Sequence, residues 1–191
     1  MKIDYNKLMQ KEISSFGDKP KLLLHCCCAP CSSAVIEKLK NYFEITYFYY
    51  NPNISPESEY FKRVEEQKRF IEALPTVHPV HFEEGTYEPS EFYDTVKGYE
   101  KCPEGGERCF LCYELRLRES AKRAKAGGYD YFTTTLSISP LKNAAKLEEI
   151  SAKLEDEYGI LHLPSDFKKK KVEQGAEYVL LSVLIKLLSM H

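Results

Sequence analysis

The cysteines of this chain are confined to two short segments that lie far apart in the sequence. The first is the run His25-Cys-Cys-Cys-Ala-Pro-Cys31, and the second contains Cys102 followed by the C-x-x-C pair Cys109 and Cys112. Only a folded chain can bring such distant sulfurs together. Three consecutive cysteines cannot all face one core, because neighbouring side chains point in different directions. The pattern therefore favours a thiolate-bound metal centre over a set of cysteines packed simply as apolar residues.

The residues outside these segments indicate a reducing compartment and one domain. Residues 1–19 contain no apolar signal core and have the pattern of an amphipathic helix, so we expect a cytoplasmic protein with reduced thiols. The apolar stretch 178–188 is shorter than the ~20 residues of a membrane span, and we expect no membrane association. With 191 residues, 43% of them hydrophobic, the chain suits a single α/β domain over 1–191, in which 1–19 form an N-terminal helical extension.

Short β-rich runs alternate with amphipathic stretches along the whole chain. This alternation predicts βαβ units and a mainly parallel, Rossmann-like sheet with helices on both faces. The predicted strands are 21–24, 45–50, 77–82, 129–136 and 160–163, and the predicted helices are 32–43, 57–74, 88–97, 110–126, 142–158 and 173–188.

Three unusual segments follow predicted strands or end them. They are the cysteine run 25–31, the turn Asn51-Pro-Asn53 and the stretch 133–139, Thr-Thr-Thr-Leu-Ser-Ile-Ser. Ligands of parallel α/β sheets bind at the carboxyl ends of the strands. We therefore expect the functional site at this edge of the sheet.

The spacing of the thiols leaves two kinds of metal centre open. Structural zinc prefers four cysteines in two C-x-x-C pairs, which suits the second segment but not three adjacent cysteines. A [4Fe–4S] cluster accepts ligands at irregular spacing, and we favour it over zinc. Thiols in excess of four leave room for a second metal acting as a Lewis acid. Its candidate ligands include Cys102 and the carboxylates of Asp94, Asp130 and Asp166.

A series of ordered motifs from about residue 20 to about residue 175 resembles the QueH family of cobalamin-independent epoxyqueuosine reductases. The resemblance implies a two-electron removal of oxygen, in which the epoxide of epoxyqueuosine at the tRNA wobble position becomes the alkene of queuosine. The motifs are His25-x-Cys27-Cys28-Ala-Pro-Cys31, Tyr50-Asn-Pro-Asn-Ile54, Glu59-Tyr60 with Arg63, Pro103-Glu-Gly-Gly with Arg108-Cys-x-x-Cys112 and Arg116-Leu117, Thr134-Thr-Leu-Ser-x-Ser-Pro140, and Asp166-Phe-Lys-Lys169.

The resemblance also assigns roles to the thiols. It implies that Cys27, Cys28, Cys109 and Cys112 bind the [4Fe–4S] cluster and that Cys31 is a spare thiol for catalysis or for a second iron or other divalent metal. The family pattern does not require cysteine at positions 26 and 102. Many members end in a closely spaced cysteine pair, whereas this chain has no cysteine after Cys112. We therefore expect electrons to come directly from a donor protein or through a thiol of the first segment.

Epoxide reduction also needs a proton donor and a tRNA-binding surface. His25 or Tyr50 is the candidate donor, although a histidine beside a strand is as commonly a packed core residue. The net charge of −2 provides no overall basic field, so the tRNA contacts must be local. The predicted nucleic-acid-binding residues are Lys168, Lys169, Lys170, Lys171, Arg116 and Arg123.

The alternative is an α/β nucleotide- or RNA-binding protein whose cysteines hold a structural Cys₄ zinc. No G-x-x-x-x-G-K-[ST] phosphate loop occurs in the sequence, and the first predicted strand ends in cysteines rather than glycines. A structural zinc site also leaves the additional thiols unexplained. An iron–sulfur oxidoreductase acting on tRNA is therefore the leading hypothesis.

Overall fold

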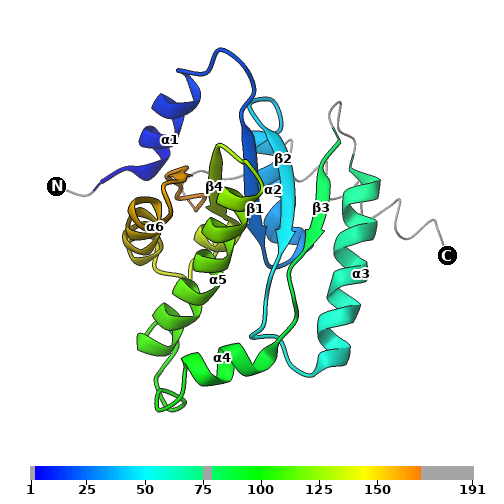
Figure 1. Ribbon diagram of the computed structural model, residues 1–191, viewed down its shortest axis with the longest axis vertical. Coiled ribbons are helices and arrows are strands. Elements are labelled where there is room, and N and C mark those ends of the chain that lie inside the picture. Colours follow the sequence, from blue (N-terminus) through cyan, green and yellow to red (C-terminus); the bar gives the residue numbers. More distant parts are fainter. Residues whose placement is uncertain (1–2, 75–78, 169–191) are drawn as a thin grey trace.

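The computed structural model describes residues 3–74 and 79–168, so the predicted helix 173–188 lies outside the described residues. Figure 1 shows the helices packed around a central sheet. In chain order the elements are α1 Tyr5–Ile13, β1 Lys21–Cys26, α2 Ala29–Leu39, β2 Glu44–Tyr49, α3 Glu57–Ala73, β3 His81–Glu84, α4 Pro89–Thr95, α5 Glu107–Ala126, β4 Tyr131–Thr134, the short 3₁₀ helix η1 Thr135–Ile138, α6 Ala144–Tyr158 and β5 Leu161–His162.

The five strands form one parallel sheet in the order β3-β2-β1-β4-β5. Leu23 of β1 pairs with Thr46 of β2 on one side and with Phe132 of β4 on the other. The chain runs outward from β1 to β3, then crosses to β4 and continues outward to β5. The strand order therefore reverses between β1 and β4, and ligands of doubly wound folds bind at such a switch point. The predicted fold class is confirmed.

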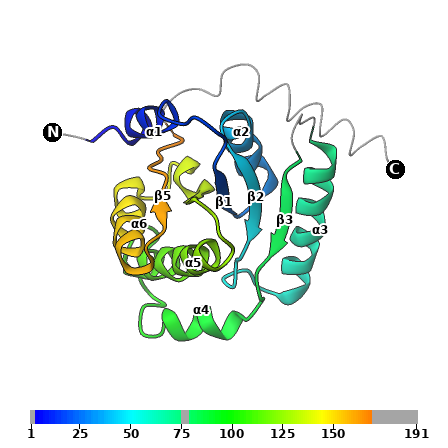
Figure 2. The same cartoon turned by 45° about the horizontal axis from the view of Figure 1, so that its top comes forward.

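The two faces of the sheet are covered by different helices. Helices α1, α2 and α3 bury their apolar residues against one face, and α5 and α6 cover the other (Figure 2). The period of two along a strand produces this division. In β1, Leu22, Leu24 and Cys26 point to the first face and Leu23 to the second. The N-terminal helix α1 contributes Met9 and Ile13 to the first core and is therefore packed onto the domain.

The predicted element boundaries differ from the structure at β3, which covers His81–Glu84 instead of 77–82, and around the site. Strand β1 continues to Cys26, and α2 begins at Ala29, before the predicted Ser32, because Pro30 suits the first turn of a helix. Strand β4 ends at Thr134 instead of Leu136. The Thr134 hydroxyl accepts a hydrogen bond of 3.1 Å from the Leu136 amide, which turns the chain into η1. Within 3–74 and 79–168, no helix has the length and apolar character needed to cross a membrane.

Candidate metal centre

The cysteine run connects β1 to α2 at the switch point of the sheet. Strand β1 ends at Cys26, and η1 follows the neighbouring strand β4 directly. The Cys27 Sγ lies 3.9 Å from the Oγ1 of Thr135, the first residue of η1. The first predicted cysteine segment and the Thr-rich segment therefore meet at the carboxyl edge of the two central strands.

Three thiols of this run form a compact group. The Sγ atoms of Cys27, Cys28 and Cys31 all lie within 4.8 Å of one another, and those of Cys27 and Cys28 are 3.9 Å apart. Each of the three residues is partly accessible to solvent. Across 3–74 and 79–168, this is the one group of three such side chains close enough to share a metal ion.

Both cysteine segments lie at the N-terminus of a helix. Cys28 is the N-cap of α2 and Cys31 lies in its first turn, while Cys109 lies in the first turn of α5 after the N-cap Gly106. The Gly105 amide donates a hydrogen bond of 3.3 Å to the Cys109 Sγ. Unpaired amides and the helix dipole make these ends electropositive, which suits them to bind an anionic group.

The hydrogen bonds within the trio select which thiol ionises first. Hydrogen bonding with the Cys28 and Cys31 thiols lowers the Cys27 pKa well below its usual value despite burial, and the charge of Arg116 lowers it further. Interaction with Cys27 raises the pKa values of Cys28 and Cys31. A bound metal would displace the thiol protons, because only deprotonated cysteines serve as its ligands.

Arg116 links the second cysteine pair to the end of β1. Its Nη1 lies 3.8 Å from the Cys112 Sγ, and its Nη2 donates a hydrogen bond of 2.7 Å to the Asn51 Oδ1. The Asn51 amide in turn donates a 2.9 Å hydrogen bond to the carbonyl of Cys26. Arg116 is only 4% exposed, which does not favour a phosphate contact, and its predicted role in tRNA binding stays a prediction. The spacing of four from Cys112 on a helix places the two side chains on one face.

Cys27 and Cys109 also pack against the same apolar cluster. This cluster lies between the sheet and α5 and includes Leu23, Phe48 and Tyr50. Cys26, by contrast, is 0% exposed, belongs to the core on the opposite face and donates its thiol hydrogen to the Leu24 carbonyl at 3.3 Å. The alternation of side chains along the strand thus separates Cys26 from its two neighbours.

His25 is buried and holds the ends of three strands together. Its Nε2 lies 3.0 Å from the Tyr50 carbonyl and its Nδ1 lies 2.9 Å from the Thr134 Oγ1. A carbonyl can only accept, so Nε2 carries the proton and Nδ1 accepts from the threonine hydroxyl. Burial, reinforced by the charge of Arg116, lowers the His25 pKa to about 3. The imidazole is therefore neutral and has both nitrogens engaged, which favours a positioning role over the predicted proton transfer.

Tyr50 connects the site to the surface through a carboxylate. Its hydroxyl donates a hydrogen bond of 2.5 Å to the Oε2 of Glu91, an exposed residue of α4. Burial and this carboxylate raise the Tyr50 pKa above its usual value. The ring fits closely over Gly85, where an added Cβ would lie 2.8 Å from the Tyr50 Cδ2. Tyr50 therefore holds its proton firmly in a fixed position.

The predicted ligands of a second metal do not gather in the described part of the chain. Asp130 precedes β4 and accepts a 2.8 Å hydrogen bond from the Lys21 amide, so it lies at the sheet edge opposite the cysteines. The Asp166 carboxylate accepts from the Lys168 amide at 3.3 Å, and Asp94 lies on α4. Cys102 lies in the loop before α5. None of the four joins Cys31 in a three-ligand group.

The predicted basic residues are distributed over separate places. Lys168 donates to the carbonyl of Lys142, and Arg123 forms an ion pair with Glu83 of β3. Residues 169–171 lie outside the described residues, so the rest of the lysine run stays a prediction.

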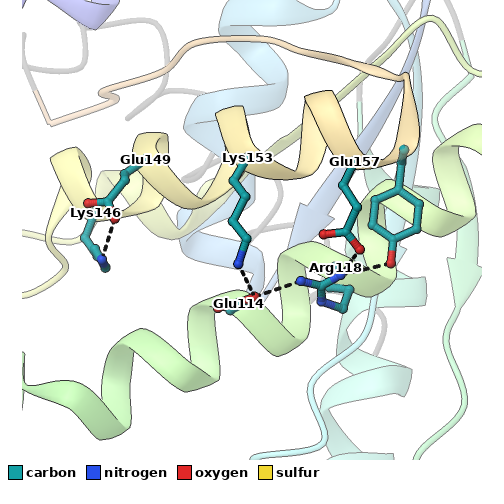
Figure 3. Close-up of polar contacts among 7 residues, drawn as sticks. Glu114, Arg118, Lys146, Glu149, Lys153 and Glu157 are labelled. Carbon is teal, nitrogen blue, oxygen red and sulfur yellow. Dashed lines mark hydrogen bonds and ion pairs between the residues drawn. The ribbon is translucent and has the colours of Figure 1, made fainter.

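A network of charged residues fixes α5, the helix that carries the C-x-x-C pair, against α6. Arg118 of α5 donates to Glu114 at 2.8 Å and also pairs with Glu157 of α6, while Lys153 of α6 lies 3.4 Å from Glu114 (Figure 3). Figure 3 also shows Lys146 and Glu149 further along α6, 2.6 Å apart. The Arg118–Glu157 and Lys153–Glu114 pairs join α5 to α6 and so help to position the helix that carries Cys109 and Cys112.

Two polar atoms of the site have no hydrogen-bond partner among residues 3–74 and 79–168. They are the Nε of Arg116 and the hydroxyl of Tyr49, both of which are buried. Both side chains lie within electrostatic range of Cys27. Buried polar groups are normally satisfied, so a further acceptor is expected beside the thiols. The grouped thiols of Cys27, Cys28 and Cys31, the N-termini of α2 and α5 and these free donors fit an anionic metal–thiolate group, whereas Cys109 and Cys112 do not join the three-thiol group in this structure.

Sequence reasoning did not assign the positioning residues. The turn Asn51-Pro-Asn53 was recognised as unusual, but no pattern indicated that Asn51 binds Arg116. Nothing in the local sequence of α4 indicated Glu91, which reaches Tyr50 only through the tertiary fold.

Fold and site together define a doubly wound α/β protein with a group of cysteines that could hold a metal at the switch point of its sheet. Comparison with known proteins identifies the family within this class. A sequence model of the family described as "Epoxyqueuosine reductase QueH" matches residues 22–182. The chain belongs to the QueH family, whose members are oxidoreductases that carry out the last step of queuosine synthesis in tRNA.

Individual relatives agree with the family match. Epoxyqueuosine reductase QueH of Staphylococcus epidermidis is 43% identical over 177 residues, which cover 89% of this chain and 74% of that protein. The protein of the same name from Streptococcus pyogenes is 37% identical over 187 residues, 93% of this chain and 73% of the relative. The protein of the same name from Thermotoga maritima is 34% identical over 148 residues, which cover 78% of this chain and 75% of that protein.

Proposed function

We propose that this chain reduces the epoxide of epoxyqueuosine in tRNA to the alkene of queuosine at a [4Fe–4S] cluster. Both carbon–oxygen bonds of the epoxide break, a carbon–carbon double bond forms, and two electrons and two protons convert the oxygen to water. The observation that carries the proposal is the thiol group at the switch point of a sheet in a chain of this family. A ligand site at that edge is the rule for doubly wound folds.

The proposed cluster ligands are Cys27 and Cys28 after β1 and Cys109 and Cys112 on α5. Two contacts support this set. Cys27 and Cys109 border the same apolar cluster, and Arg116 reaches the Cys112 Sγ while its charge also acts on Cys27. The bound cluster would supply single electrons and a Lewis-acidic iron.

Cys31 is the proposed spare thiol. Its Sγ lies within 4.8 Å of those of Cys27 and Cys28, so it borders the centre from the first turn of α2. There it can serve as a catalytic thiol or bind an additional iron or other divalent metal. Since Asp94, Asp130, Asp166 and Cys102 do not join it, any further ligands of such a metal must include water or substrate.

Tyr50 is the proposed proton donor for the leaving oxygen. It carries a proton on Oη, and its partner Glu91 is exposed and can return a proton from solvent. A positioned acid of this kind contributes about 10²–10⁴-fold to a rate. The protonated Nε2 of His25 donates its hydrogen bond to the Tyr50 carbonyl. The proposed role of His25 is therefore to hold β1, β2 and β4 in register beside the cysteines.

The substrate is proposed to be the anticodon arm of tRNA, with the modified base turned out of the loop toward the cysteines, since enzymes acting on a base remove it from the stack. Lys168–Lys171 and Arg123 remain candidate phosphate contacts, as predicted from the sequence. Phosphate contacts of this kind position the nucleic acid without reading its sequence. The electrons are proposed to come from a separate donor protein in the cytoplasm.

Anaerobic purification followed by iron and sulfide analysis tests the proposal. We expect a coloured protein that loses its iron when Cys27, Cys28, Cys109 or Cys112 is replaced by serine. Cys31→Ser should keep the cluster but lose turnover of epoxyqueuosine tRNA. A colourless protein with one zinc and no sulfide would refute the iron–sulfur assignment.

Tyr50→Phe tests the proton donor separately. We expect normal iron content and a turnover lowered by about 10²–10⁴-fold. Tyr93→Phe is the matched control, because Tyr93 is an exposed tyrosine of α4. A Tyr50→Phe protein with the activity of the parent would remove Tyr50 from the reaction.

A further inference from the structure

Arg116 is a buried cation without a carboxylate partner. It is 4% exposed, and across residues 3–74 and 79–168 no ion pair joins it to an aspartate or glutamate. Two other arginines of α5 differ: Arg118 pairs with Glu114 and Glu157, and Arg123 pairs with Glu83. Arg118 and Arg123 are also more exposed to solvent, and an unpaired charge in contact with water would cost little free energy.

The contacts of the guanidinium point to a missing anion on the cysteine side. Its Nη2 donates a hydrogen bond of 2.7 Å to the Asn51 Oδ1, and its Nη1 faces the Cys112 Sγ at 3.8 Å. Its Nε has no hydrogen-bond partner among the described residues. A buried charge is strongly unfavourable unless an opposite charge compensates it. The neutral Asn51 amide orients the side chain but provides no such charge.

Asn51 fixes the direction of the guanidinium. Its Nδ2 donates to the Cys26 carbonyl at 2.9 Å, so its Oδ1 must face Arg116. Because Cys26 immediately precedes the first cysteine of the trio, this bond ties the position of Arg116 to the backbone that carries Cys27 and Cys28. The cation is thus held between the two cysteine segments.

We infer that Arg116 is the resident counter-charge of the metal–thiolate centre, that it raises the reduction potential of the bound cluster, and that Asn51 is its positioning residue. The inference rests on the proposed function and adds a charge-balancing residue to it. A cubane bound by four thiolates is an anion whose charge grows on reduction. A fixed positive charge therefore stabilises the reduced form more than the oxidised form, and net charge and hydrogen bonds to sulfur are known determinants of such potentials.

A redox titration of anaerobically reconstituted protein, followed by absorption or electron paramagnetic resonance, tests the effect on potential. R116Q removes the charge and keeps a donor for Asn51, whereas R116K keeps the charge. We expect R116Q to disfavour reduction by about tenfold or more, which corresponds to about 59 mV for one electron. R116K should lie between R116Q and the parent. K122Q is the matched control, because Lys122 is an exposed cation on the same helix, and its potential should not change.

Stability with and without metal provides a second and independent test. In chelator-treated, metal-free protein Arg116 lacks the anionic metal centre and acts only on the Cys27 thiol, so R116Q should lose little or no stability relative to the parent. In loaded protein R116Q should be clearly less stable than the parent. This difference between the two states distinguishes a counter-charge from a residue that merely packs, because loss of packing would lower stability equally in both states.

Three outcomes decide the inference. An unchanged potential in loaded R116Q overturns it, and so does an equal loss of stability in the two states. R116Q that folds stably but retains less metal supports it. If the purified protein contains zinc, the iron–sulfur part of the proposed function fails, while the metal-free and metal-loaded stabilities still decide the role of Arg116.

Discussion

Replacing His25 by leucine tests how the ends of the central strands are held beside the cysteines. The imidazole is 0% exposed and bonds the Tyr50 carbonyl and the Thr134 hydroxyl, both of which the substitution would leave without this partner. Leaving a buried polar group unsatisfied costs about 1–3 kcal/mol, so the two together predict a loss of about 2–6 kcal/mol at pH 7.5. Domains of this size have a total stability of only about 5–15 kcal/mol.

The loss of stability caused by His25→Leu should depend on pH. Burial lowers the pKa of His25 to about 3 from a usual value of 6.5. Between these values the unfolded chain binds a proton that the folded protein does not, so the contribution of His25 is present above pH 6.5 and is lost as the pH falls toward 3. The difference between parent and His25→Leu should therefore shrink by about 1.4 kcal/mol per pH unit below pH 6.5.

Urea unfolding of reduced, metal-free protein at several pH values measures this difference. Other titrating groups are common to both proteins and cancel in the subtraction. His81→Gln is the control, because His81 is exposed at the start of β3 and its replacement should change stability by no more than about 0.5 kcal/mol. A difference between parent and His25→Leu that stays constant from pH 7.5 to pH 5 would refute the neutral, buried histidine.

Three further predictions concern other contacts. Gly85→Ala should lower stability by about 1–3 kcal/mol and reduce turnover, because its Cβ would lie 2.8 Å from the Tyr50 Cδ2; an unchanged melting temperature would contradict this. Cys26→Ser should retain full iron content, since Cys26 lies in the opposite core, and a variant without iron would contradict the ligand assignment. Burial raises the pKa of Glu148 to about 8 from 4.5, so its contribution to stability is present below pH 4.5 and is lost as the pH rises through 8. Glu148→Gln should abolish that loss, measured as unfolding midpoints from pH 5 to pH 9, and a parallel decline in both proteins would refute it.

The arrangement of the sheet could be predicted from the sequence because short β-rich runs alternate with amphipathic stretches, as in βαβ units. Strands β1 and β2 are buried on both faces, so a run such as 45–50 is almost continuously apolar or aromatic. The end of β4 could not be predicted in this way. The Thr134 side chain competes with the strand for the amide of Leu136, and hydroxyl side chains do this only in a suitable tertiary setting.

The cysteines of the site could be predicted, whereas its positioning residues could not. Cysteine is rare and its clustering is informative at once. Arg116 looks like any surface cation of a helix, and its burial follows from the amide of Asn51, which the fold brings in from another strand end. Likewise, the pairing of Glu91 with Tyr50 depends on where α4 crosses below the strands (Figure 1).

The two cysteine-bearing helices belong to different halves of the doubly wound fold. Helix α2 follows β1 in the first half, and α5 leads back into the second half at β4. Under the proposed ligand set, a metal held by sulfurs of the β1–α2 connection and of α5 would join these two segments, so its loading would follow their docking. It would also close a long loop of chain and stabilise the folded state by restricting the unfolded one.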